Sequence, residues 1–61
     1  MNTATKIAFS LANAADAVDC SQKHLTRAIH AGDLRAKKVG RGFRIDARDL
    51  QKWFDSLPDA D

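Results

Sequence analysis

Apolar residues recur with helical spacing in the first third of the chain. The first stripe runs at i, i+3, i+4 and i+7 and consists of Leu11, Ala14, Ala15 and Val18. One face of a short helix would bury such a stripe. Ser10 stands just before it and is a suitable N-cap, because its hydroxyl can accept a hydrogen bond from a free amide of the first turn. The pattern therefore predicts a short helix that begins after Ser10.

A second helical stripe begins after a break of only a few residues. Ser21 is a second candidate N-cap, and Leu25, Ala28 and Ile29 continue with helical spacing. Gly32 is expected just past the end of this helix, because glycine readily adopts the left-handed backbone that closes a helix. Two short helices joined by so tight a turn predict a helix-turn-helix.

The spacing changes to a period of two over residues 36–45, which predicts a β-hairpin. One face of this hairpin is expected to hold the apolar Val39, Phe43 and Ile45. The other face is expected to hold Lys38 and Arg44. Gly40 and Gly42 flank the tip and are expected to supply the positive φ angles of a tight turn.

A third helix is predicted after Asp46, which is expected to cap its first turn. Its apolar stripe comprises Ala47, Leu50, Trp53, Phe54 and Leu57, and Pro58 ends it. Aromatic residues at this spacing are typical of packing, so we assign Trp53 and Phe54 to the core and give them no direct function. The expected core consists of the larger apolar residues, namely Ile7, Phe9, Leu11, Val18, Leu25, Ile29, Leu34, Val39, Phe43, Ile45, Leu50, Trp53, Phe54 and Leu57.

Length and composition limit the architecture. Sixty-one residues give room for one domain with one small core. We expect a frayed segment over residues 1–8, a domain over 9–57 and a short acidic tail over 58–61. The single cysteine cannot form an internal disulfide, and no apolar run is long enough for a membrane span or a signal peptide. A reducing cytoplasm without membrane contact is therefore the expected location.

Charge is distributed unevenly along the chain. Residues 22–48 carry eight cationic side chains and two aspartates, whereas the remainder carries two lysines and six aspartates. A segregated positive surface implies a polyanionic partner, and nucleic acid is the commonest one. An ordinary solvated charged face is the alternative interpretation.

The second predicted helix and the hairpin carry the side chains that suit double-stranded DNA. Amide, guanidinium, ammonium and methyl groups read base edges in the major groove, mostly from the N-terminal part of a helix. The predicted major-groove set is Ser21, Gln22, Lys23, Thr26, Arg27 and His30. The predicted hairpin set, for the minor groove or the phosphates, is Lys37, Lys38, Arg41, Gly42 and Arg44. The alternative is that the helix residues are ordinary solvated side chains.

The order helix, tight turn, helix, two-stranded hairpin, helix predicts an α+β fold, namely a small winged helix-turn-helix. The hairpin is the wing, and the third helix is a packing buttress. The chain also resembles the excisionase-type winged helix-turn-helix family and the DNA-binding heads of mercury-resistance regulators. The resemblance covers Phe9 to Leu57 and rests on the ordered segments Ser10-Leu-Ala-Asn-Ala-Ala, Cys20-Ser21, Gly32-Asp33-Leu34, Val39-Gly40-Arg41, Phe43-Arg44-Ile45 and Asp49-Leu50-x-x-Trp53.

This resemblance implies a phage excisionase, that is, a recombination directionality factor. Such a protein binds attachment-site DNA cooperatively with neighbouring copies of itself, bends the DNA and directs a tyrosine or serine integrase toward excision. It would act in the cytoplasm of a bacterial host, on the nucleoid. Asp19 stands where the family often has glycine, which is tolerable because aspartate can adopt the left-handed conformation. Thr26 stands where the family often has an aromatic residue.

Two other functions are compatible with the same sequence. A small winged-helix transcriptional regulator would need the same fold, and a protein-interaction domain would not bind DNA at all. Catalysis is not expected, because the carboxylates are scattered and no nucleophile has an evident base. Cys20 and His24 are four residues apart but lack further ligands, so no metal or cofactor is expected. We expect Cys20 to be a small apolar plug between helices and His24 to be either a partly buried residue or a residue of the N-terminal turn.

Overall fold

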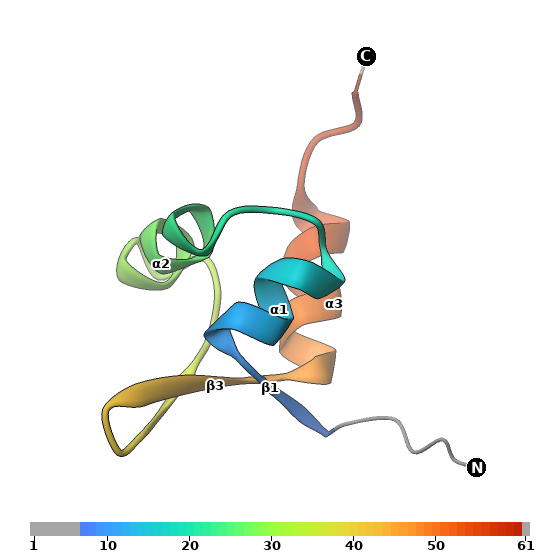
Figure 1. The fold of residues 1–61 in the computed structure, drawn as a ribbon. Coiled ribbons are helices and arrows are strands. Elements are labelled where there is room, and N and C mark those ends of the chain that lie inside the picture. Colours follow the sequence, from blue (N-terminus) through green and yellow to red (C-terminus); the bar gives the residue numbers. More distant parts are fainter. Residues whose placement is uncertain (1–6, 61) are drawn as a thin grey trace, which may run out of the picture.

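A computed structural model describes residues 7–60, which form three helices beside a small sheet (Figure 1). The elements follow the order β1 (Ala8–Ser10), α1 (Leu11–Ala17), α2 (Gln22–His30), β2 (Lys37–Val39), β3 (Gly42–Asp46) and α3 (Ala47–Ser56). The α+β fold and the winged helix-turn-helix order are confirmed. Within the described residues no helix is both long enough and apolar enough to cross a membrane.

Side-chain caps begin all three helices at the predicted residues. The Ser10 and Ser21 hydroxyls each accept a hydrogen bond from the backbone amide three residues on, at 3.2 and 3.1 Å. The Asp46 carboxylate accepts one from the amide two residues on, at 2.8 Å. Each cap satisfies an amide that has no partner within its helix. These three short polar side chains therefore fix where the helices begin.

The turn between α1 and α2 is closed by backbone hydrogen bonds around Asp19. The Asp19 amide donates to the Asp16 carbonyl at 3.1 Å, and the Cys20 amide donates to the Ala15 carbonyl at 2.9 Å. Asp19 has a φ of 55°, so this is a Schellman motif with aspartate in the left-handed position. The expectation for Asp19 is confirmed, and Gly32 closes α2 in the same way with a φ of 84°.

The sheet has three strands in the order β1-β3-β2, so the prediction of a two-stranded hairpin was incomplete. Strand β1 pairs with β3 in antiparallel fashion, and Ala8 lies opposite Asp46. The Ala47 amide also donates to the Ile7 carbonyl at 3.0 Å. Ala8 therefore belongs to the sheet and not to a frayed terminus, while residues 1–6 lie outside the described part of the chain. A three-residue strand leading directly into a helix is too short for a period-2 pattern to reveal.

The pairing register of the hairpin differs from the predicted one. Lys38 lies opposite Phe43, and Val39 lies opposite Gly42. Residues directly opposite each other in an antiparallel pair project on the same side, so Lys38 shares its face with Phe43, and Val39 shares its face with Arg44. The prediction that joined Val39 with Phe43 is wrong. In a hairpin with a two-residue turn, each odd-numbered residue of one strand lies opposite an even-numbered residue of the other. The odd-numbered residues of the two strands therefore lie on different faces of the hairpin.

Only one of the two hairpin glycines has a positive φ. Gly40 has a φ of 60°, whereas Gly42 does not have a positive value. Arg41 follows Gly40 in the turn, also without a positive φ. Glycine at the first central position is typical of a type II′ turn, whose twist matches that of the flanking strands. The prediction of a positive φ at Gly42 is therefore wrong, and Arg41 stands at the tip.

The core joins side chains from α1, α2, the sheet and α3. The buried side chains are Ala14, Ala15, Leu25, Leu34, Ile45, Leu50 and Trp53. Partly buried residues that pack against them are Phe9, Leu11, Val18, Ala28, Ile29 and Ala36. The structure contradicts four core predictions, since the exposed apolar residues are Ile7, Val39, Phe54 and Leu57. On α3 the apolar stripe is wider than the face that the small core covers.

Candidate nucleic-acid interface

Helix α2 presents a polar face on the side opposite its buried residues. Leu25 is fully buried, and Ala28 and Ile29 pack against the core. At 100° per residue the positions opposite these three fall on the solvent side. Three of the predicted residues lie there and are exposed, namely Lys23, Arg27 and His30, while Thr26 is half-buried at the margin and Gln22 is exposed in the first turn, next to the stripe of Ile29. The structure thus places Lys23, Thr26, Arg27 and His30 of the predicted major-groove set on one side of α2, with Gln22 beside them in the first turn and Ser21 as the N-cap before the helix.

Two hydroxyl groups of this set are already engaged with the backbone. The Thr26 hydroxyl donates to the Gln22 carbonyl at 2.9 Å, so its methyl group is what remains for an external contact. The Ser21 hydroxyl accepts a bond from the His24 amide, so it still has its own proton to donate. A methyl group suits the methyl of thymine, and a hydroxyl donor at a helix N-terminus suits a phosphate.

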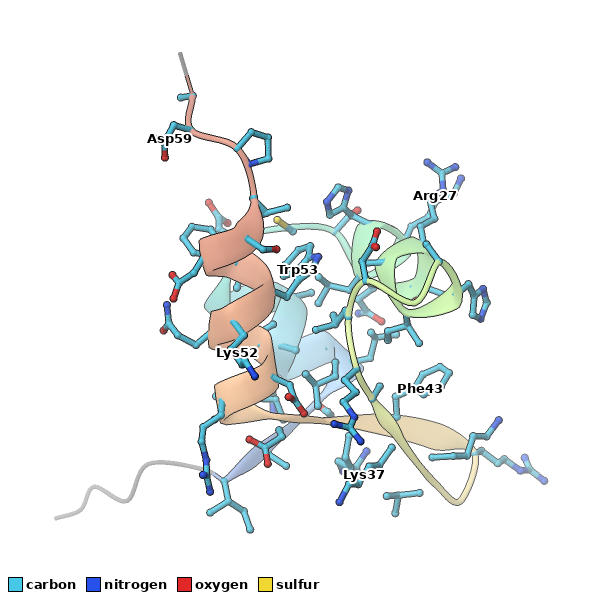
Figure 2. All side chains as sticks on the ribbon, turned by 180° about the vertical axis from the view of Figure 1, so that it is seen from behind. Arg27, Lys37, Phe43, Lys52, Trp53 and Asp59 are labelled. Carbon is cyan, nitrogen blue, oxygen red and sulfur yellow. The ribbon has the colours of Figure 1, made fainter. Side chains whose placement is uncertain are left out.

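Helix α2 is held against the rest of the molecule by an aromatic contact as well as by its core residues. The rings of His24 and Trp53 have centroids 5.9 Å apart and are tilted by 56°. Trp53 is only 5% exposed and lies between α3 and α2 (Figure 2). His24 lies in the first turn of α2, one of the two predicted alternatives, and it is exposed. The predicted buttress, α3, therefore contacts the first turn of α2 directly.

The hairpin distributes its cationic side chains over two faces and a tip. The exposed ones are Lys37, Lys38, Arg41 and Arg44, while Gly42 is half-buried. Figure 2 shows Phe43 on the side of the hairpin that faces α2 and Lys37 on the opposite side. The Lys38 ammonium lies 5.6 Å from the centroid of the Phe43 ring, within reach of a cation–π interaction. Phe43 was predicted to be a core residue; instead it is half-buried beneath Lys38.

Arg44 is folded back along the hairpin. Its Nη1 donates to the Phe43 carbonyl at 2.9 Å. The same atom would lie 3.6 Å from a Cβ added at Gly42, which is an ordinary van der Waals distance. A guanidinium group has five N–H donors, so Arg44 keeps most of its capacity for a phosphate. Gly42 therefore has room for a side chain as well as an unstrained φ.

Helix α2 and the hairpin tip project from the same side of the molecule, away from α3 (Figure 1). Six of the eight cations in residues 22–48 belong to these two elements, and the exceptions are Arg35 and Arg48. Figure 2 shows Arg27 on the outer side of α2, while Lys52 and Asp59 lie on and beyond α3. A polyanion would therefore meet α2 and the hairpin together.

Candidate metal ligands are not clustered in the part of the chain that the structure describes. That part contains no group of three or more His, Cys and Asp side chains that could hold a metal ion. Cys20 is half-buried and its thiol donates to the Val18 carbonyl at 3.5 Å, consistent with a small plug in the turn before α2.

Comparison with known families finds one match. Residues 8–58 match the family model described as a helix-turn-helix domain. The matched segment contains the two helices, the hairpin and α3, so it includes every element that forms the candidate interface. No curated protein and no solved structure gives a significant match.

Proposed function

The chain belongs to the helix-turn-helix domain family, which includes excisionase-like proteins, and on that premise we propose that it is a sequence-specific double-stranded DNA-binding protein acting as a phage excisionase. In this proposal it binds attachment-site DNA beside further copies of itself, bends the duplex and directs an integrase toward excision. The observation that carries the proposal is that α2 and the hairpin, both of which have exposed cationic side chains, project on the same side of the molecule, away from α3 (Figure 1).

Helix α2 enters the major groove, which is wide enough for an α-helix. Gln22 can pair with adenine, and Lys23 or Arg27 with the O6 and N7 atoms of guanine. The methyl group of Thr26 reads a thymine methyl, since its hydroxyl is bonded within the helix. The Ser21 hydroxyl caps the start of α2, His30 is its last residue, and both contact phosphates.

The hairpin grips the duplex beside that groove. Arg41 at the tip suits a narrow minor groove, where the negative potential is strongest. Lys37, Lys38 and Arg44 neutralise phosphates, which releases counterions and makes affinity fall steeply with salt. Contacts from α2 and from the wing on one duplex favour a bent DNA, because bending is compensated by the additional contacts it allows.

Mobility shift and recombination assays with the same DNA test this proposal. Attachment-site DNA with tandem sites should be shifted by the chain at low salt, and excision products should appear with integrase only when the chain is present. Lys52→Ala is a matched control, because it removes a cation of α3 away from the interface. It should leave both results unchanged.

Two outcomes would contradict the excisionase proposal in different ways. Specific binding without any change in integrase products would indicate the transcriptional regulator instead. No binding of any DNA at low salt would indicate the protein-interaction domain.

A further inference from the structure

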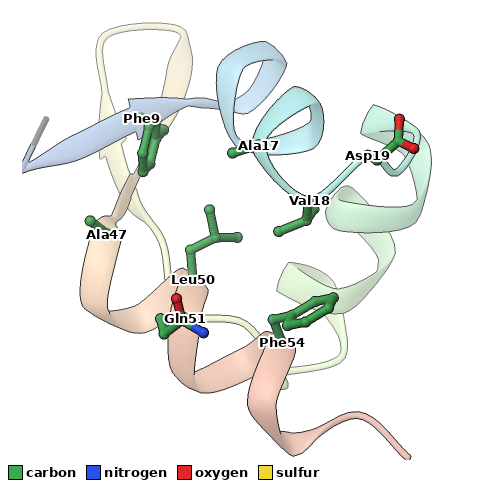
Figure 3. A pocket seen from close by; sticks show the side chains of 8 residues that line it. All are labelled: Phe9, Ala17, Val18, Asp19, Ala47, Leu50, Gln51 and Phe54. Atoms are coloured by element: carbon green, nitrogen blue, oxygen red, sulfur yellow. The ribbon is translucent and has the colours of Figure 1, made fainter. Parts of the chain in front are cut away.

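A second surface lies between α1 and α3, and we call it the α1–α3 groove. It has a volume of about 460 Å³. Its apolar walls are Phe9, Val18, Leu50 and Phe54, and its polar margin includes Asp19 and Gln51. Figure 3 shows Phe9 at one end of the groove, and Val18, Asp19 and Phe54 toward the other. None of the residues assigned to the DNA interface lines it.

The exposed aromatic ring in this groove is not needed to fill the core. Phe54 is 49% exposed, although its helical neighbours Leu50 and Trp53 are almost completely buried. Leu57, one turn further on, is also exposed. Apolar side chains gathered in an open groove with a polar margin mark a site of interaction with another molecule.

Charge around the Phe54 end of the groove is negative. Asp19 is the only charged residue that lines the groove. On α3, Gln51 donates through Nε2 to the Asp55 carboxylate at 3.0 Å, which holds that carboxylate beside the lining residue. Lys52 lines a separate depression on another side of α3. DNA would be repelled here, whereas a cationic partner would be attracted.

We propose that the α1–α3 groove docks a basic amphipathic helix of a partner protein. Apolar side chains at i, i+3, i+4 and i+7 of the partner insert between α1 and α3, as in other helix-in-groove complexes. Its lysines or arginines lie against Asp19 and Asp55. This proposal goes beyond DNA binding and uses none of the residues assigned to it.

A peptide titration followed by NMR tests the proposal on the full chain. The probe is an end-blocked peptide of about 14 leucine and lysine residues, four helical turns, with leucines at helical spacing. Saturable amide shift changes should map to the groove, with dissociation constants of roughly 10 to 100 μM, as expected for a small interface. A peptide of the same composition with scrambled leucines should bind at least about tenfold more weakly, because it has no single apolar face.

Two variants of the chain sharpen this test. Phe54→Ser should weaken peptide binding by about tenfold or more, because it removes the more exposed of the two phenylalanine side chains that line the groove. Asp19→Asn should weaken it severalfold and reduce its salt dependence, since asparagine keeps the left-handed turn but not the charge. Ile7→Ser is the control, because Ile7 is 87% exposed and lies outside the groove. It should leave peptide binding unchanged, and thermal unfolding would verify that each variant folds.

Three results would overturn the proposal: equal binding of the scrambled peptide, shift changes confined to α2 and the hairpin, or unchanged affinity in Phe54→Ser. A dimer detected by sedimentation and lost in Phe54→Ser would also overturn it, because the occupant would then be a second copy. Mobility shift with DNA should be the same for Phe54→Ser and the unaltered chain. Failure of the groove proposal is thereby distinguishable from failure of the DNA-binding proposal.

Discussion

The two parts of the proposed DNA surface are anchored in different ways. Helix α2 is capped at its start by Ser21, is closed by Gly32, and buries Leu25 completely. Strand β2 has three residues, all exposed, and it pairs only with β3 at the edge of the sheet. The hairpin reaches the core chiefly through Ile45 of β3. Helix α2 is fixed in position, whereas β2 and the tip of the hairpin have few contacts beyond the pairing with β3 that would prevent them from adapting.

This difference in anchoring affects how each part would recognise DNA, either by its base sequence or by the shape of the duplex. Base discrimination depends on hydrogen-bond geometry, so it needs a reader whose position is fixed, and α2 meets that need. Phosphate contacts and minor-groove insertion tolerate small displacements and follow the local width of the duplex. We therefore expect α2 to determine which site is chosen, and the hairpin to supply affinity at every site.

The largest expected effect concerns the anchoring itself. Leu25→Ala should lower the free energy of unfolding by about 2 to 5 kcal/mol, because it leaves a cavity in a small core. Val39→Ala is the counterpart in the hairpin, and its effect should stay within about 0.5 kcal/mol, since Val39 is 51% exposed. Urea unfolding of both variants measures the difference. Similar losses at the two positions would show that the hairpin is as firmly anchored as α2.

The next effect concerns specificity and is expected at Arg27. Arg27→Ala should weaken binding to a DNA site selected from a random pool by about 1 to 3 kcal/mol, because a paired base edge loses its partner. Binding to a scrambled sequence should change much less. Mobility shifts on both DNAs at one salt concentration measure this. An equal loss on the two DNAs would make Arg27 a phosphate contact and remove the main distinction between α2 and the hairpin.

A smaller and more uniform effect is expected at the tip of the hairpin. Arg41→Ala should weaken binding to the selected and scrambled DNAs to the same extent and lower the salt slope by about one, as for the loss of one phosphate contact. Lys52→Ala removes the same charge from α3 and should leave the slope unchanged. A shift in the preferred base sequence of Arg41→Ala would contradict the assignment of the hairpin to shape and grip.

The same two regions show which features can be predicted from sequence. The caps of α2 and its polar face depend on residues within one or two helical turns, and local rules predicted them correctly. The hairpin faces depend on turn length, so the partner of Phe43 was missed, although a two-residue turn at Gly40 would have revealed it. Strand β1 pairs only with a distant strand, and the exposure of Phe54 depends on how far the core extends. Neither of these features has a local signal.

The smallest expected effect lies within the hairpin, where Phe43 can act as a positioning residue for Lys38. The ammonium lies 5.6 Å from the ring centroid, and an exposed cation–π contact is worth about 0.5 to 1 kcal/mol. Phe43→Leu keeps an apolar side chain but removes the ring, so binding to any DNA should weaken by roughly twofold to fivefold. The same change in a Lys38→Met background should have almost no effect, because no ammonium remains to be positioned. A double-mutant cycle on DNA affinity measures this coupling. If Phe43→Leu weakened binding equally in both backgrounds, the ring would act by stabilising the hairpin and not by positioning Lys38. Packing within the hairpin would then contribute more to its stability than the exposure of β2 indicates.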